Sequence, residues 1–244
     1  MDFRRRDDFG VEPWRYPGEP VPHSGLMTDD SYRPLPDPGS LDRTLTGLGV
    51  APVVRRHTVL AVGSNASRSV MWRKFTTRKA SPVVPFLQAA VRGLRPGHSA
   101  HISIRGFIPA APVFDPDART VLVVSLLDDE QLAALDATEP NYQRLRLDPR
   151  SCPVELEDGT SLEDVWVYVS EHGTLAQPGE APLSLLPQEE LFSLLRRECE
   201  QIASLLPDDP HSAMKSLAAS ADLRTSVVEA LRAAGWIRPA SYLR

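Results

Sequence analysis

Residues 58–65 read Thr-Val-Leu-Ala-Val-Gly-Ser-Asn, an apolar run that leads directly into a small polar turn. Four consecutive apolar residues, 59–62, are typical of a strand that is covered on both faces. Gly63 permits close backbone approach or a positive φ, and the side chains of Ser64 and Asn65 can bind turn amides. Such a turn presents N–H groups that can hold a carboxylate or stabilise an oxyanion. The stretch predicts a buried strand that ends at a candidate binding turn.

A second segment, residues 132–144, reads Leu-Ala-Ala-Leu-Asp-Ala-Thr-Glu-Pro-Asn-Tyr-Gln-Arg. Asp128, with Gln131 three residues later, forms the pattern of a capping box and predicts a helix start. Pro140 ends that helix, and a strand is expected over residues 142–147. Glu139 is therefore expected at a helix end beside a strand, a position that a rigid scaffold fixes accurately.

Together the two segments resemble the γ-glutamylcyclotransferase-like superfamily, over about residues 59–169. Members carry a Tyr-Gly-Ser-Asn turn after the first strand and, later, a Leu-Asp-x-x-Glu segment followed by Tyr and Arg. Val62 replaces the aromatic residue before the Gly, and Ala66 replaces the apolar residue often found after the Asn. These departures bear on the substrate contacts more than on the fold. The matching positions are Gly63, Ser64, Asn65, Leu135, Asp136, Glu139, Tyr142 and Arg144.

The resemblance implies an α+β fold, a small mixed or antiparallel β-barrel flanked by helices. It also implies intramolecular acyl transfer, in which the α-amine of a γ-glutamyl group attacks its own γ-carbonyl and releases 5-oxoproline and an amine. Glu139 is then the expected catalytic acid and base, because one carboxylate can remove a proton and later return it. Gly63, Ser64, Asn65 and Tyr142 are expected to bind the small γ-glutamyl substrate, and no metal or cofactor is required.

The residues themselves leave other interpretations open. Glu139 can merely cap a turn or pair with Arg144, and Tyr142 can fill the protein interior. The chain can also be a non-catalytic ligand-binding or interaction protein that retains the fold. A third alternative is an enzyme that removes a γ-glutamyl group from a biosynthetic intermediate. The amine half of the substrate and the oligomeric state are open at this stage.

Composition narrows the class of protein. The 244 residues are 42% hydrophobic and 24% charged, as in globular proteins. The net charge of −5 gives no reason to expect a nucleic-acid partner. No apolar run approaches the length of a membrane span, so no membrane partner is expected. Only Cys152 and Cys199 occur, which excludes a disulfide framework and favours a cytoplasmic location.

Competing catalytic and metal sites have weak patterns. His98 and His101 lie three residues apart, but no carboxylate or Cys stands near them at ligand spacing. They are predicted to be ordinary loop and strand residues. Ser64 does not lie in a Gly-x-Ser-x-Gly elbow, so the sequence gives no support for a serine triad. We therefore expect no metal site.

The chain divides into three predicted segments. Residues 1–56 hold eight of the 23 prolines and are expected to form an irregular, wrapped arm without a catalytic role. Residues 57–186 are expected to form the γ-glutamylcyclotransferase-like barrel domain. Residues 187–244 are expected to form a helical extension packed on the barrel, because each predicted helix there has one apolar face.

Local patterns predict the remaining elements. We expect a basic and aromatic surface segment over residues 67–75, in which Arg68, Arg73 or Lys74 at most faces an acidic substrate. A helix is expected over residues 85–94. A strand is expected over residues 101–107, in which Gly106 marks a bulge or a close approach. A turn at residues 115–117 should precede a buried strand at 119–126. Residues 154–169 should form a hairpin around the Asp158-Gly159 turn.

Overall fold

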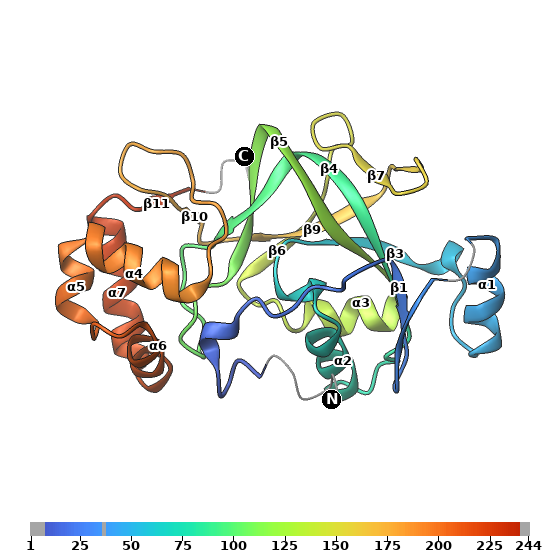
Figure 1. Ribbon diagram of the computed structural model, residues 1–244, viewed down its shortest axis with the longest axis horizontal. Helices are drawn as coiled ribbons and strands as arrows, with labels where there is room; N and C mark the ends of the chain where they lie inside the picture. Colours follow the sequence, from blue (N-terminus) through green and yellow to red (C-terminus); the bar gives the residue numbers. More distant parts are fainter. Residues whose placement is uncertain (1–7, 36–37, 240–244) are drawn as a thin grey trace. The chain divides into compact units, whose positions relative to one another are not determined.

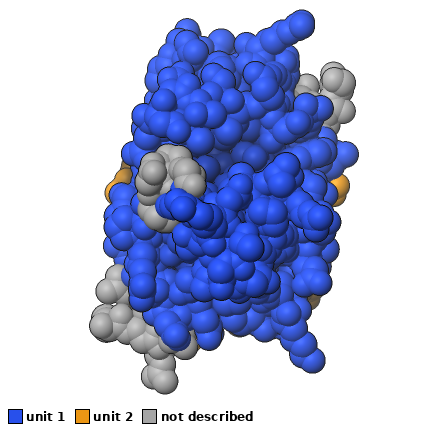
Figure 2. Space-filling model, turned by 90° about the vertical axis from the view of Figure 1, so that its right-hand side faces the viewer, with its two compact units in different colours: residues 1–6, 19–95, 114–169 blue, residues 7–18, 96–113, 170–244 orange. Residues whose placement is uncertain are grey.

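The computed structural model describes residues 8–35 and 38–239 (Figure 1). They fall into two compact units. Unit 1 holds residues 19–95 and 114–169, and one of its faces fills the view in Figure 2. Unit 2 holds residues 8–18, 96–113 and 170–239. The boundaries of these units differ from those of the three consecutive segments expected from the sequence. The division into an arm, a central domain and a helical extension remains a prediction.

Nine strands of the described chain form one mixed sheet. The path runs β2-β1-β4-β5-β3-β9-β6, while β7 pairs with both β4 and β8. Strand β3 pairs antiparallel with β5 and parallel with β9, so it has a neighbour on each side. The strands are β1 (Gly25–Met27), β2 (Tyr32–Pro34), β3 (His57–Ala61), β4 (Val84–His98), β5 (Ala110–Leu127), β6 (Tyr142–Arg146), β7 (Val154–Leu156), β8 (Ser161–Leu162) and β9 (Val165–Ser170).

This sheet confirms the α+β class and the first predicted strand, in which Val59 and Leu60 are buried. It does not confirm the predicted barrel. The path starts at β2 and ends at β6, and within the described residues those two edge strands do not pair. A barrel needs its edge strands to close on each other. The predicted Asp158-Gly159 turn is present between β7 and β8, which pair antiparallel.

Unit 1 contains α1 (Pro38–Gly47), α2 (Arg68–Thr77) and α3 (Asp129–Asp136). Helices α2 and α3 contact each other (Figure 1). Their apolar side chains join sheet residues in one core cluster that includes Val59, Met71, Phe75, Leu127 and Leu135. This packing fixes the turn that precedes α2 and the connection that follows α3.

The predicted start of α3 is confirmed in detail. The Asp128 side chain accepts from the Gln131 amide at 2.9 Å, and the Gln131 side chain accepts from the Asp128 amide at 3.0 Å. This is the reciprocal capping box that the sequence indicated. Gln131 also donates to the carbonyls of Ser81 and Val83 at 2.7 and 3.0 Å. The cap is therefore tied to a neighbouring loop.

The helix predicted over residues 85–94 is wrong, because that stretch lies in strand β4. Ala89 and Val91 are buried, whereas Ala90 and Arg92 are exposed, which is the two-residue period of a strand. Backbone pairing with β1 and β7 holds this conformation. The apolar spacing of the segment fits both periods, and tertiary pairing decides between them.

The strand predicted over residues 101–107 is also wrong. The segment is a tight loop, in which the Gly106 amide donates to the Ser103 carbonyl at 2.9 Å. Gly106 has a φ of 89°, and a Cβ there would lie 2.0 Å from the Met214 carbonyl oxygen. The close approach expected at Gly106 is therefore confirmed. Ile104 is 78% exposed, which is incompatible with an alternating buried strand.

Two further local predictions are wrong. Residues 67–75 do not form a surface segment but lie mostly in α2, where Val70, Met71 and Phe75 are buried. Residues 115–117 do not form a turn but continue β5. There the Asp115 carboxylate accepts from Arg95 at 2.9 Å and from the Asp117 amide at 3.1 Å, so side-chain bonds accompany the strand.

The N-terminal region is more regular than its prolines suggest. Strand β1 pairs antiparallel with β4, and Met27 is fully buried in the core cluster of unit 1. Helix α1 follows after β2. The expectation of an irregular arm over residues 1–56 is wrong for these elements. Three-residue strands are too short to show a period, so only their partners reveal them.

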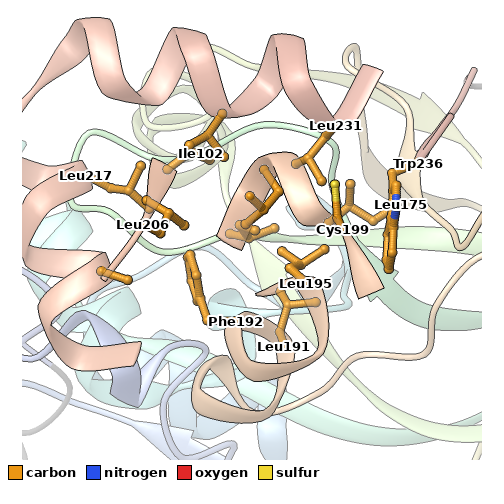
Figure 3. Close-up of a cluster of buried hydrophobic side chains, with 14 of the residues drawn as sticks. Ile102, Leu175, Leu191, Phe192, Leu195, Cys199, Leu206, Leu217, Leu231 and Trp236 are labelled. Carbon is orange, nitrogen blue, oxygen red and sulfur yellow. The ribbon is translucent and has the colours of Figure 1, made fainter. Parts of the chain in front are cut away.

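Unit 2 contains four α-helices in its described part, which pack around one apolar cluster (Figure 3). The helical content expected over residues 187–244 is confirmed, and Cys199 separates the first two of these helices. Trp14, from the segment 8–18, packs against this cluster and stacks on His211 at 4.1 Å. The helices are α4 (Gln188–Glu198), α5 (Glu200–Leu205), α6 (Pro210–Ala219) and α7 (Ala221–Ala233), beside strands β10 (Thr174–Leu175) and β11 (Ile237–Arg238).

Candidate functional site

The turn after β3 forms a short 3-10 helix over Ser64–Ala66. Gly63 adopts a φ of −149°, so the positive φ considered for it is not used. The amides of Ala66 and Ser67 bond back to the turn. Within the described chain, the amides of Gly63, Ser64 and Asn65 donate to no acceptor. This is the expected condition of the first N–H groups in a helical turn, and it leaves them available to a ligand.

Glu139 lies in the connection between α3 and β6. Its amide donates to the Asp136 carbonyl at 3.0 Å, and its carbonyl accepts from the Tyr142 amide at 3.0 Å. Both bonds fix the backbone of the connection. The side chain is 13% exposed, so the carboxylate is mostly, but not completely, removed from water. The expected position at a helix end beside a strand is confirmed.

The Glu139 carboxylate belongs to a three-residue polar cluster. Lys74 Nζ donates to Glu139 Oε1 at 2.6 Å and to Asn65 Oδ1 at 2.7 Å. Asn65 Nδ2 donates to the same Glu139 oxygen at 3.1 Å. The three side chains come from α2, the turn after β3 and the connection between α3 and β6, and they close a ring of hydrogen bonds. The structure thus brings together the two predicted site residues Asn65 and Glu139.

The two oxygens of Glu139 differ in their surroundings. Oε1 accepts from Lys74 and Asn65, and the Thr138 hydroxyl lies 3.4 Å from it. Oε2 accepts no hydrogen bond from the residues that the structure describes. A carboxylate oxygen has two lone-pair sites, so Oε1 is largely occupied whereas Oε2 is open. A proton exchanged with a ligand would therefore be carried by Oε2.

Arg144 does not pair with Glu139, so that alternative is wrong. Its guanidinium binds the Asp136 carboxylate through two bonds of 2.9 and 3.2 Å, and it lies 4.7 Å from the ring of Trp166. The Tyr168 hydroxyl also donates to Asp136, at 2.6 Å. Burial, followed by the contact with Asp136 and the nearby Glu139 charge, raises the pKa of Tyr168. Asp136 therefore anchors the end of α3 to β6 and β9.

Tyr142 begins β6 and is half-buried. Its side chain packs against the core cluster of unit 1. A role in binding substrate remains a prediction, as do the roles of Gly63, Ser64, Asn65 and Glu139.

Lys74 is not among the predicted site residues, although the sequence gives it as one of three basic residues that at most face an acidic substrate. Its side chain is 18% exposed and lies on α2, between the buried Met71 and Phe75. The basic and aromatic composition of residues 67–75 did not indicate a helix, so the sequence did not predict that the Lys74 side chain lies on the same side of α2 as the buried residues. An isolated lysine on the inner side of an amphipathic helix would have been the signal.

Elsewhere, the described residues contain no group of three or more potential metal ligands among His, Cys, Asp and Glu. The same residues contain no helix long and apolar enough to cross a membrane. A cavity of about 410 Å³ lies on unit 1 among β4, β5, β7 and β8, with Val91, Arg119 and Leu162 in its lining. No residue of the Glu139 cluster lines it.

Comparison with known proteins gives matches among solved structures. No family model matches the chain, and no curated protein matches it. The chain is similar to γ-glutamyl cyclotransferases of known structure. One of them is 13% identical, covers 71% of this chain and 98% of its own, and has a TM-score of 0.38.

Two further solved structures resemble the chain. A yeast γ-glutamyl cyclotransferase specific to glutathione is 13% identical over 67% of this chain and 98% of its own, with a TM-score of 0.32. An Arabidopsis thaliana protein is 19% identical over 59% of this chain and 85% of its own, with a TM-score of 0.39. TM-scores below 0.5 do not establish a function for this chain.

Proposed function

We propose that the protein is a γ-glutamylcyclotransferase-like enzyme that acts on a small γ-glutamyl amine or peptide. It would release 5-oxoproline and the free amine. The observation that carries the proposal is the Glu139 carboxylate, which is held through Oε1 and open at Oε2. Its neighbour in the cluster, Asn65, comes from the turn whose amides have no acceptor among the described residues.

Proton transfer is the task assigned to Glu139. Oε2 removes a proton from the α-ammonium of the γ-glutamyl group, and the resulting amine attacks the γ-carbonyl carbon. A new carbon–nitrogen bond closes the five-membered ring, and Glu139, which has released the first proton to water, takes the second proton from the ring nitrogen. When the bond to the leaving amine breaks, Glu139 gives this proton to the nitrogen of that amine, so the carboxylate is regenerated.

We assign to the turn after β3 the role of stabilising the developing oxyanion. During the attack, the carbonyl oxygen gains negative charge, which prearranged N–H donors stabilise. The amides of Gly63, Ser64 and Asn65 have the required free donors. The contact between the Asn65 side chain and Glu139 supports this assignment, because it links the turn that carries these amides to the proposed base.

A non-catalytic binding protein is the second candidate. The observation that favours it is the 2.6 Å ion pair between Lys74 and Glu139, which occupies one oxygen of the proposed base. Val62, in place of the family's aromatic residue, removes a possible substrate contact. Removal of a γ-glutamyl group from a biosynthetic intermediate would use the same Glu139 and differs in the fate of the glutamyl carbonyl.

The test replaces Glu139 by Gln, which keeps the shape but removes the basic oxygen. We expect 5-oxoproline release from a panel of γ-glutamyl amines to fall by about a hundredfold or more. Glu130→Gln is the matched control, because Glu130 is an exposed carboxylate in the first turn of α3. Full activity of Glu139→Gln would remove Glu139 from the mechanism. No release by the wild type from any panel member would favour the binding protein.

A further inference from the structure

The Lys74 ammonium has an unused donor beside the open oxygen of Glu139. An ammonium carries three N–H donors. Lys74 directs one to Glu139 Oε1 and one to Asn65 Oδ1, and no other acceptor for it occurs in the described part of the chain. The cluster thus offers a ligand one positively charged donor and one negatively charged acceptor, on side chains that are themselves hydrogen-bonded.

We propose that Lys74 binds the free α-carboxylate of the γ-glutamyl group while Glu139 Oε2 receives its α-ammonium. This inference rests on the proposed function and adds to it the residue that selects for the α-carboxylate. An α-amino acid head group carries opposite charges on two substituents of one carbon, which complements the donor and acceptor of the cluster. Substrates must then have both the α-amine and the α-carboxylate unblocked.

Burial strengthens the charge complementarity. The side chains of Lys74 and Glu139 are 18% and 13% exposed, so water screens their charges less than it does at the surface. The buried neighbours Met71 and Phe75 hold α2 against the core and so fix the origin of the Lys74 side chain. A charge held in this way recognises a carboxylate at a defined place.

Lys74 takes no part in the proton transfers of the proposed reaction. Its proposed role is to select substrates that carry an α-carboxylate. A 4-aminobutyryl amide can form the same carbon–nitrogen bond, release the same amine and yield 2-pyrrolidinone. It lacks only the carboxylate. Comparing γ-glutamyl anilide with 4-aminobutyryl anilide therefore isolates the contact with Lys74, because both release aniline.

The experiment measures kcat/KM for both anilides with wild type, Lys74→Met and the control Lys79→Met, which replaces an exposed lysine on unit 1. We expect wild type and the control to prefer γ-glutamyl anilide by about 10- to 100-fold, the scale of one charged hydrogen bond. Lys74→Met should lose most of that preference. An equal loss on both anilides would overturn the proposal, because Lys74 would then act only through Glu139.

Two outcomes keep the inference distinct from the proposed function. If Lys74→Met does not fold by circular dichroism, the wild type alone decides, since equal turnover of both anilides contradicts a carboxylate contact. If the wild type releases no aniline, cyclotransferase activity is rejected. Calorimetry with the same anilides then tests Lys74 separately: a binding preference that Lys74→Met abolishes supports the site, and equal or absent binding overturns it.

Discussion

Two buried histidines in unit 2 are expected to control stability in mild acid. His98 Nε2 accepts from the Leu186 amide at 2.8 Å, and burial lowers the pKa of His98 to about 4. His101 Nδ1 lies 2.6 Å from the Ser99 hydroxyl, and burial, together with His172, lowers the pKa of His101 to about 3. Both rings are therefore neutral in the folded protein at neutral pH.

Their lowered pKa values set the direction of the pH effect. Above about pH 6.5, both folded and unfolded states hold neutral rings, and the stability contribution is complete. Below it, the unfolded state binds protons that the folded state excludes down to about pH 4 for His98. The free energy of unfolding should therefore fall by about 1.4 kcal/mol per pH unit for each ring.

Urea unfolding at pH 7.5, 6 and 5 measures this slope. The variants His98→Gln and His101→Gln keep an acceptor for the Leu186 amide or the Ser99 hydroxyl but do not titrate. Each should flatten the decline between pH 6.5 and 5. His23→Gln, at an exposed position, is the control and should retain the wild-type slope. An unchanged slope in both buried variants would assign the acid sensitivity to other groups.

At the site, the sequence predicts Asn65 and Glu139 as site residues, whereas it gives Lys74 only as one of three basic residues that at most face an acidic substrate. The first two lie in short motifs whose order along the chain is informative. Lys74 has no motif, and its direction follows only from the packing of α2 through Met71 and Phe75. The pairing of Arg144 with Asp136 was missed for the same reason, since two nearby carboxylates compete for one arginine and only the geometry of β6 decides.

The capping box of α3 allows a prediction at the level of one helix. Asp128→Ala removes the cap and a negative charge near Arg56, and it should lower the free energy of unfolding by about 1 kcal/mol. Gln131→Ala should cost more, because Gln131 is fully buried and also bonds the Ser81 and Val83 carbonyls and accepts from Arg56. Chemical denaturation of both variants gives the comparison. Equal losses would show that the loop contacts contribute little.

Elements with their own local signals were predicted correctly, whereas those defined by partners were not. The α3 start has a reciprocal cap, and β3 has an uninterrupted apolar run. By contrast, β4 carries apolar residues whose spacing fits a helix equally well, and its pairing with β1 and β7 selects the strand. Local chemistry reveals a cap, but pairing across a sheet depends on residues far along the chain.

For the whole molecule, the N-terminal region is expected to matter for stability. A chain that begins at Ala51 lacks β1, with the buried Met27, and Trp14, which packs in unit 2. Its thermal unfolding midpoint should therefore be lower than that of the full chain. Arg33→Ala, on the exposed part of β2, is the control and should melt like wild type. An unchanged midpoint after the deletion would show that the segment is separable from the rest of the fold.

The interleaving of the two units has a consequence during synthesis on the ribosome. Strand β3 cannot form its parallel pairing with β9 until β9 emerges, roughly 100 residues later. Trp14 is translated early, but its ring can stack on His211 only after α6 has been synthesised. Unit 1 cannot be completed before residue 169 has been made, and unit 2 cannot be completed before the C-terminal helices, so apolar segments of the nascent chain stay exposed until then. Such chains are prone to aggregate, and recovery of folded protein should depend on chaperone supply and translation speed.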